Sequence, residues 1–218
     1  MISLFSPIGK VLKTVPECLI MFADTNWKAV SAELMGTFFL VFFGYISFIN
    51  LKDNNMLFEG ALTLGLTLLV LVHTLGPVSG CHLNPIITIP VWLSGKMSLE
   101  DSIAYIIAQI TGASLGFILF KALNPGTSDS IFEDDLALMM AAMIGTTFFV
   151  YSLLSSQDPM SIGATVFVVS MTAFYEVNPS VSLGEVIGNG NDLLIFGIIG
   201  SFIGCFVGWA IKENIIDQ

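Results

Sequence analysis

Arginine is absent from this sequence, and charged residues of any kind are few. All seven basic residues are lysine, and charged residues make up 11% of the 218 residues, against about 25% in soluble domains. Hydrophobic residues make up 55% and the mean hydropathy is +0.86. This composition excludes an ordinary soluble domain and predicts an integral membrane protein in a lipid bilayer. The formal net charge of −10 argues against a nucleic-acid partner.

Cysteine and histidine are scarce as well. Three cysteines, Cys18, Cys81 and Cys205, and two histidines are too few and too scattered for a disulfide framework or a zinc site. No nucleophile beside a general base and no phosphate-binding loop stands out, so we expect neither an enzyme nor a cofactor or metal. Cys81, three residues before Asn84, is either a target for small thiol reagents or a packed, inert side chain.

Long apolar runs, in contrast, are abundant, and a run of about 20 residues predicts a membrane-spanning helix. Six runs are separated by short polar joints, the fifth run being the shortest: 30–50, 58–75, 99–123, 136–155, 160–173 and 192–211. Only Lys52 and Lys121 would lie outside if the N-terminus is inside, so both termini are predicted to be cytosolic. Residues 1–28 are then an arm, 29–213 one transmembrane domain and 214–218 a tail.

Asn-Pro occurs twice inside this apolar sequence, in GCHLNPIITIP (80–90) and FYEVNPSVSLG (174–184). Asn is a favoured helix N-cap and Pro suits the first helical turn, so Asn84-Pro85 and Asn178-Pro179 predict two helix starts. The runs that follow have about ten residues and are too short to cross a bilayer. Irregular backbone at membrane depth must line a water-filled path or be buried in protein, which predicts two re-entrant half-helices.

The two halves of the chain repeat one pattern: span, span, Asn-Pro segment, span. GTFFLVF (36–42) and GTTFFVY (145–151) open comparable spans. Three spans per half is an odd number, so the repeats at about 29–123 and 134–213 have opposite orientations. The half-helices would meet N-terminus to N-terminus at mid-membrane, with their positive ends and Asn amides toward the path. The predicted fold is an all-α membrane protein of six transmembrane helices plus two re-entrant half-helices in an inverted repeat.

Four segments carry a family resemblance: AELMGTFFLVFFG (32–44), LTLGLTLLVLVHTLGPVSGCHLNP (62–85), YIIAQITGASLG (105–116) and NPSVSLG (178–184). In this order and spacing they resemble the aquaporin and aquaglyceroporin channels. The resemblance implies a narrow pore in each subunit of a homotetramer. It also implies passive flow of water or small neutral solutes such as glycerol, urea, ammonia or peroxide. Glycines at 112 and 116, and at 200, 204 and 208, suit the close helix crossings of such a fold.

The signature triplets depart from the family pattern at their third residue, which is usually alanine. They read Asn84-Pro85-Ile86 and Asn178-Pro179-Ser180. Ile86 is larger than alanine and would shift the packing between the half-helices, whereas Ser180 is nearly isosteric with alanine. The Asn donors are retained, so waters can still be oriented at the centre.

In the family, four positions narrow the outer half of the pore, and here they depart further from the family pattern. The resemblance places these positions on Leu64, Val166, Tyr175 and Val181, the last of which is normally arginine. Losing arginine removes fixed positive charge and strong donors, which help exclude cations and protons from water pores. Three aliphatic side chains and one phenol remain.

The buried acids also differ from the family, in which a Glu on the first helix and one on the fourth each hold the opposite loop. Glu33 matches the first, while Ala142 stands at the second. The resemblance therefore places Glu33 at the second Asn-Pro loop, beside the additional Glu176, where the two carboxyl groups would share a proton. Alternatively, Glu176 turns outward into solvent. His82 is expected to brace its loop rather than to relay protons.

Three functions are compatible with these residues. A passive channel for water or small neutral solutes, with an unorthodox filter, is the leading hypothesis. The second is a non-conducting structural or assembly subunit of the same fold, its pore closed by Tyr175 and Ile86. The third is an ion-conducting derivative, allowed by the lost arginine and the gained Glu176.

Overall fold

The computed structural model describes residues 22–47, 56–123, 135–171, 178–189 and 195–216. Within these ranges the regular elements are all helical, and no strand occurs among them. The elements are α3 (Trp27–Phe39), its π-helical continuation η2 (Leu40–Tyr45), α5 (Leu57–Ser79), α6 (Pro85–Leu93), α7 (Leu99–Leu123), α8 (Asp135–Ser155), α9 (Pro159–Met171), α10 (Pro179–Asn189), α11 (Ile195–Ile211) and its π-helical continuation η3 (Lys212–Ile216).

The predicted membrane spans match these helices closely. Five are long and apolar enough to cross a membrane, and a sixth apolar helix, α9, is shorter, with 13 residues. The two helices that start at the Asn-Pro prolines, α6 and α10, have nine and eleven residues, far below the roughly 20 that a span requires. The structure thus confirms the predicted all-α membrane fold of six spans and two half-helices.

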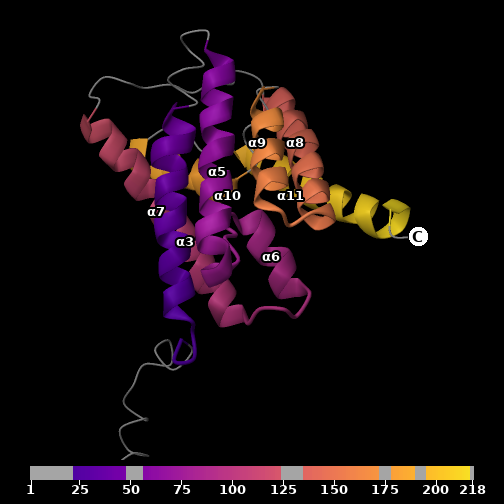
Figure 1. The fold of residues 1–218 in the computed structure, drawn as a ribbon, viewed down its shortest axis with the longest axis horizontal. Helices are drawn as coiled ribbons and strands as arrows, with labels where there is room; N and C mark the ends of the chain where they lie inside the picture. Colours follow the sequence, from indigo (N-terminus) through magenta and orange to yellow (C-terminus); the bar gives the residue numbers. More distant parts are fainter. Residues whose placement is uncertain (1–21, 48–55, 124–134, 172–177, 190–194, 217–218) are drawn as a thin grey trace, which may run out of the picture.

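The helices form two groups of three, with the half-helices between them. Helices α3, α5 and α7 lie on one side and α8, α9 and α11 on the other (Figure 1). Each half-helix contacts both α7 and α11, and the two half-helices also contact each other. The groups meet where α5 packs on α9. There, a Cβ added to Gly65 would lie 2.7 Å from the Gly163 carbonyl oxygen, and one added to Gly163 would lie 2.7 Å from the Gly65 carbonyl. Such reciprocal contact is typical of two-fold symmetry.

Glycines bring matching helices together in both groups. In the first, Gly112 and Gly116 of α7 lie against the backbone of Leu34 and Phe38 in α3. In the second, Gly204 and Gly208 of α11 lie against the backbone of Met143 and Thr147 in α8. Aligning the Gly-Thr motif of the first span with that of the fourth also aligns Leu34 with Met143 and Phe38 with Thr147. The internal repeat therefore includes the places where these helices cross, at which small residues allow close approach.

Candidate functional site

Each half-helix begins with the cap that its Asn-Pro pair predicts. Asn84 has an extended backbone, and its Oδ1 accepts a hydrogen bond from the Ile86 N–H at 3.0 Å. Asn178 does the same for α10, accepting from the Ser180 N–H at 3.1 Å. The proline at the first helical position of each lacks the N–H that would otherwise have no partner there. Both helices therefore present their N-termini at buried positions.

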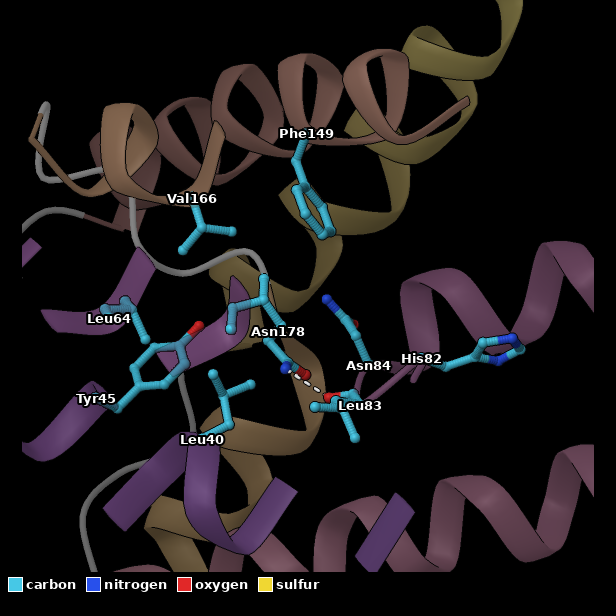
Figure 2. A pocket seen from close by; sticks show the side chains of 10 residues that line it. Leu40, Tyr45, Leu64, His82, Leu83, Asn84, Phe149, Val166 and Asn178 are labelled. Carbon is cyan, nitrogen blue, oxygen red and sulfur yellow. Dashed lines mark hydrogen bonds between the residues drawn. The ribbon is translucent and has the colours of Figure 1, made fainter. Parts of the chain in front are cut away.

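The two N-termini meet directly. The Asn178 Nδ2 donates to the Leu83 carbonyl at 2.8 Å, a bond drawn in Figure 2. Leu83 precedes Asn84, so this one bond joins the second half-helix to the start of the first. The Ser180 hydroxyl donates to the Asn178 Oδ1 at 2.7 Å, which holds that oxygen on the helix side and turns the amide nitrogen toward the other loop. Ser180 thus does more than replace an alanine, which sequence reasoning missed.

Glu33 holds the first Asn-Pro loop from inside α3. Its side chain is fully buried and accepts four hydrogen bonds. Oε1 accepts from the Ser79 hydroxyl at 2.7 Å and the His82 N–H at 2.9 Å. Oε2 accepts from the Leu83 N–H at 2.7 Å and the Gln109 Nε2 at 2.8 Å. A carboxylate offers about four acceptor positions, so this network occupies all of them.

This network corrects the expectation that Glu33 braces the opposite, second loop. Every partner of its carboxylate among the described residues belongs to the first repeat. The reason is local packing: α7 crosses α3 through its glycines, which brings Gln109 and the first loop onto the face of α3 that carries Glu33. Glu176 lies outside the described residues, as does Tyr175. Ala142, at the matching position in α8, is fully buried.

The first loop is strained where Glu33 holds it. Cys81 and Leu83 have φ values of 51° and 50°, a left-handed conformation that costs about 1–3 kcal/mol for a residue other than glycine. His82, which lies between these two residues, and Leu83 both donate their N–H groups to the Glu33 carboxylate. The Cys81 side chain is 7% exposed and packs in the apolar core. That burial favours the packed thiol over a thiol on the wall of the path.

A second group of polar contacts supports the loop from α6 and α7. The Thr88 hydroxyl donates to the Asn84 carbonyl at 3.2 Å and accepts from the Gln109 Nε2 at 3.0 Å. It also lies 3.2 Å from His82 Nδ1. The tautomer of the imidazole decides which of these two atoms donates. The Tyr105 ring lies edge-on to the imidazole at 5.4 Å, so His82 is held as a brace.

A narrow cavity of about 30 Å³ lies where the half-helices meet. Its lining includes both signature asparagines and mostly apolar side chains (Figure 2): Leu40, Tyr45, Leu64, Leu68, His82, Leu83, Asn84, Phe149, Val166 and Asn178. A buried water needs at least about 10–15 Å³ of such volume. The cavity therefore has room for a very short file of waters. Its wall is apolar apart from the two asparagines, His82 and Tyr45.

The structure brings together part of the predicted constriction. Leu64 and Val166 line the cavity with the asparagines. Val181 is 3% exposed and belongs to the apolar core, but it is not a lining residue. Ile86 packs against Val150 and Cys205 and is not among the residues that line this cavity.

Sequence reasoning missed several lining residues that come from other spans. Leu40 and Tyr45 come from the first span, and Phe149 comes from the fourth. A signal was present in the aromatic-rich end of the first span, FFLVFFGY at 38–45. The pattern alone does not tell which of these side chains turn inward.

Comparisons with known proteins agree with this geometry. The family model described as "Major intrinsic protein" matches residues 21–211. The lens fiber major intrinsic protein of Rattus norvegicus is 37% identical over 100 residues, which cover 45% of this chain and 38% of that protein. A probable aquaporin PIP2-7 of Oryza sativa subsp. japonica is 26% identical over 231 residues, which cover 87% of this chain and 79% of that protein.

Among solved structures, the aquaglyceroporin from Plasmodium falciparum matches with a TM-score of 0.69 at 17% identity. The match covers 88% of this chain and 98% of that one, and it concerns the fold. The family model spans nearly the whole chain, and the structure has two capped half-helices with a cavity between their asparagines. The protein belongs to the major intrinsic protein family.

Proposed function

We propose that the protein is a passive channel for water and other small neutral solutes, with a constriction that contains no arginine. The observation that carries this proposal is the cavity of about 30 Å³ at which Asn84 and Asn178 meet. The names of the relatives, aquaporin and aquaglyceroporin, support the same activity.

The electrostatics of the cavity suit a neutral solute. Two helix N-termini point toward it, and each carries a partial positive charge. Positive helix ends in a pore oppose cations and protons. One Asn178 N–H is bound by the Leu83 carbonyl, which leaves the second amide hydrogen for a solute, because an amide group has two donors.

Most of the wall beside the asparagines is apolar. Leu40, Leu64, Val166 and Phe149 contribute only hydrocarbon. A permeating water would exchange its bulk hydrogen bonds for few partners along this stretch, which favours a single file oriented at the asparagines and opposes hydrated ions. Leu64, Val166, Tyr175 and Val181 remain our proposal for the outer filter.

We also propose that the chain assembles as a homotetramer with its termini in the cytosol. Cross-linking in membranes and light scattering in detergent test the assembly, with a monomer as the contrary result. A membrane-impermeant thiol reagent added to right-side-out vesicles should leave Cys18, in the N-terminal arm, unmodified. Its modification would reverse the topology.

The narrowness of the cavity favours a second candidate, a non-conducting member of the fold. Room for a very short file of waters leaves little margin for permeation if the lining side chains are fixed. Such a protein would serve as a structural or assembly subunit, with the half-helices as packing elements only.

Stopped-flow light scattering on proteoliposomes separates these candidates. The channel predicts faster osmotic shrinkage than in protein-free liposomes, with glycerol and urea entry measured in parallel. Rates equal to those of protein-free liposomes for every solute would support the non-conducting subunit. A potential-sensitive dye in the same vesicles tests ion conduction, for which the channel predicts no response.

A further inference from the structure

The second half-helix lies directly on its neighbouring long helix, and two glycines allow this close contact. A Cβ added to Gly184 of α10 would overlap the side chain of Ala113 in α7. A Cβ added to Gly188 would lie 2.5 Å from the Cβ of Phe117 in the same long helix. Small residues of this kind allow helices to approach closely, so no space is left between α10 and α7 at these positions.

The first half-helix carries larger residues at the two matching positions. Aligning the two Asn-Pro pairs places Pro90 at the position of Gly184 and Ser94 at the position of Gly188. Pro90 and Ser94 both line a cleft between α6 and α11, two helices that are labelled in Figure 1. Because the internal repeat relates α11 to α7, this cleft stands where the second repeat has a closed helix contact.

The cleft between α6 and α11 is elongated. Its volume is about 300 Å³, against about 30 Å³ for the cavity between the asparagines. The lining residues of α6 include those three, four and seven positions after Ile86, and those of α11 lie three, four and seven positions after Phe202. Such spacing follows one face of a helix, and seven residues of a helix extend over about 10 Å. The walls are therefore two stripes, and the groove between them fits a linear molecule.

The side chains of the cleft offer hydrocarbon and few polar groups. The Ser94 hydroxyl already donates to the Val91 carbonyl at 2.8 Å, and the Cys205 thiol donates to the Ile86 carbonyl at 3.5 Å. The remaining polar group is the indole N–H of Trp209, a side chain that is 50% exposed. Burying a polar ligand without hydrogen-bond partners is costly, so the chemistry of the walls selects an apolar ligand.

The cleft opens toward the bilayer. Ile86 at its inner end is 1% exposed, whereas Leu93 and Phe206 are 61% and 62% exposed. Helix α11 is long and apolar enough to span a membrane, so its exposed side chains face acyl chains. An empty cleft would forfeit the van der Waals contacts of its walls, and an apolar cavity of only about 150 Å³ already takes up benzene rather than water. The linear apolar molecule next to this opening is the acyl chain of a lipid.

We propose that the cleft between α6 and α11 is a binding site for one acyl chain of a bilayer phospholipid. The chain fills the space beside the half-helix that begins at Asn84, where the second repeat uses direct contact between helices. Binding is by packing, since hydrocarbon surrounds the protein on that side as well. The site is independent of whether the protein conducts water.

Lipid retention tests this site in the intact chain. The protein is reconstituted in phosphatidylcholine and extracted with a steroidal detergent, whose rigid tail does not fit a narrow groove, and bound phospholipid is quantified by mass spectrometry. We expect the wild type to retain phospholipid. Ile89→Trp fills the cleft that Ile89 lines and should lose it. Ile187→Trp is the matched control, the same substitution on α10 at a residue that is 61% exposed and outside the cleft, and it should retain phospholipid.

A second variant removes a wall of the cleft instead of filling it. Phe206 lines the cleft and is 62% exposed, so Phe206→Ala leaves the core intact and should also lose phospholipid. Phe148→Ala in α8, at a residue that is 44% exposed and outside the cleft, should match the wild type.

Fluorescence quenching locates the retained lipid. Two further chains each keep one of the three tryptophans, either Trp209, which lines the cleft, or Trp27, which is 57% exposed on α3; the other two are replaced by phenylalanine. Both chains are reconstituted with phosphatidylcholine that is brominated on its acyl chains, and bromine quenches tryptophan on contact. After extraction into the steroidal detergent, Trp209 should stay quenched and Trp27 should not.

Three results would overturn the proposal. The first is loss of all phospholipid from the wild type during extraction. The second is equal retention by Ile89→Trp and Ile187→Trp, or by Phe206→Ala and Phe148→Ala. The third is a Trp209 that brominated lipid does not quench even within the bilayer, which would show that a second copy of the chain covers the cleft.

Discussion

Replacing Glu33 by glutamine tests how the first Asn-Pro loop is held. The variant keeps the shape of the side chain but turns one acceptor oxygen into an NH₂ group. That group would face either the pair formed by Ser79 and His82 or the pair formed by Leu83 and Gln109, all of which donate to Glu33 in the wild type. Two hydrogen bonds would be lost in either orientation, unless a donor can become an acceptor.

The magnitude follows from those two bonds. Each hydrogen bond to a charged group contributes about 1.5–3 kcal/mol, so Glu33→Gln should lower the free energy of unfolding by about 3–6 kcal/mol. If the Ser79 hydroxyl turns to accept from the new NH₂ group, only one bond is lost and the fall is about 1.5–3 kcal/mol. Because 1 kcal/mol corresponds to about 2–4 °C in a protein of this size, the loss of both bonds should lower the melting temperature by roughly 6–24 °C.

Thermal unfolding in detergent, followed by tryptophan fluorescence, measures this shift. Glu59→Gln is the matched control, since Glu59 is an exposed residue in the first turn of α5, and exposed substitutions usually change stability by less than about 0.5 kcal/mol. If Glu33→Gln melts with the wild type and with Glu59→Gln, the four-bond network does not hold the loop as described.

Three further predictions concern other contacts. Ser180→Ala removes the hydroxyl that orients the Asn cap of α10. It should reduce water flux in the proteoliposome assay and lower the free energy of unfolding by no more than about 1.5 kcal/mol. Unchanged flux would show that this bond does not matter for permeation. Thr146→Val replaces a buried hydroxyl that has no partner in the described part of the chain. It should therefore leave the melting temperature equal or higher, whereas a clear fall would reveal a partner. Gly65→Ala places a methyl 2.7 Å from a facing carbonyl oxygen and should destabilise by about 1–3 kcal/mol. Gly76→Ala in the same helix meets no atom within 4 Å and should be neutral or stabilising, and equal effects of the two would contradict the close crossing.

Local signals were enough to predict most of the fold. Apolar runs gave the spans, and the Asn-Pro pairs gave the starts of α6 and α10, because capping and the first turn depend on adjacent residues only. The second span was predicted to end at residue 75, whereas α5 continues through Pro77 to Ser79. Proline is tolerated in membrane helices, since neighbouring groups satisfy the backbone that it frees.

The site was harder to predict because its contacts join distant residues. Glu33 meets donors 46 to 76 positions away, and which loop it reaches depends on how α7 crosses α3. The inward turn of Tyr45 depends on a change of hydrogen-bond register in η2, which hydrophobic periodicity does not reveal. The missing arginine, in contrast, is a plain fact of the sequence, and it limits any filter this chain can build.

The osmotic water permeability of proteoliposomes carrying the wild type or Val166→Trp tests most directly whether solutes pass between Asn84 and Asn178. Val166 lines the cavity, so an indole there should fill a space of about 30 Å³ and reduce the rate to that of protein-free liposomes. Val168→Trp, on the same helix at a position 48% exposed on the outer surface, should keep the wild-type rate. A Val166→Trp rate equal to that of the wild type, or a wild-type rate equal to that of protein-free liposomes, would contradict the path described here.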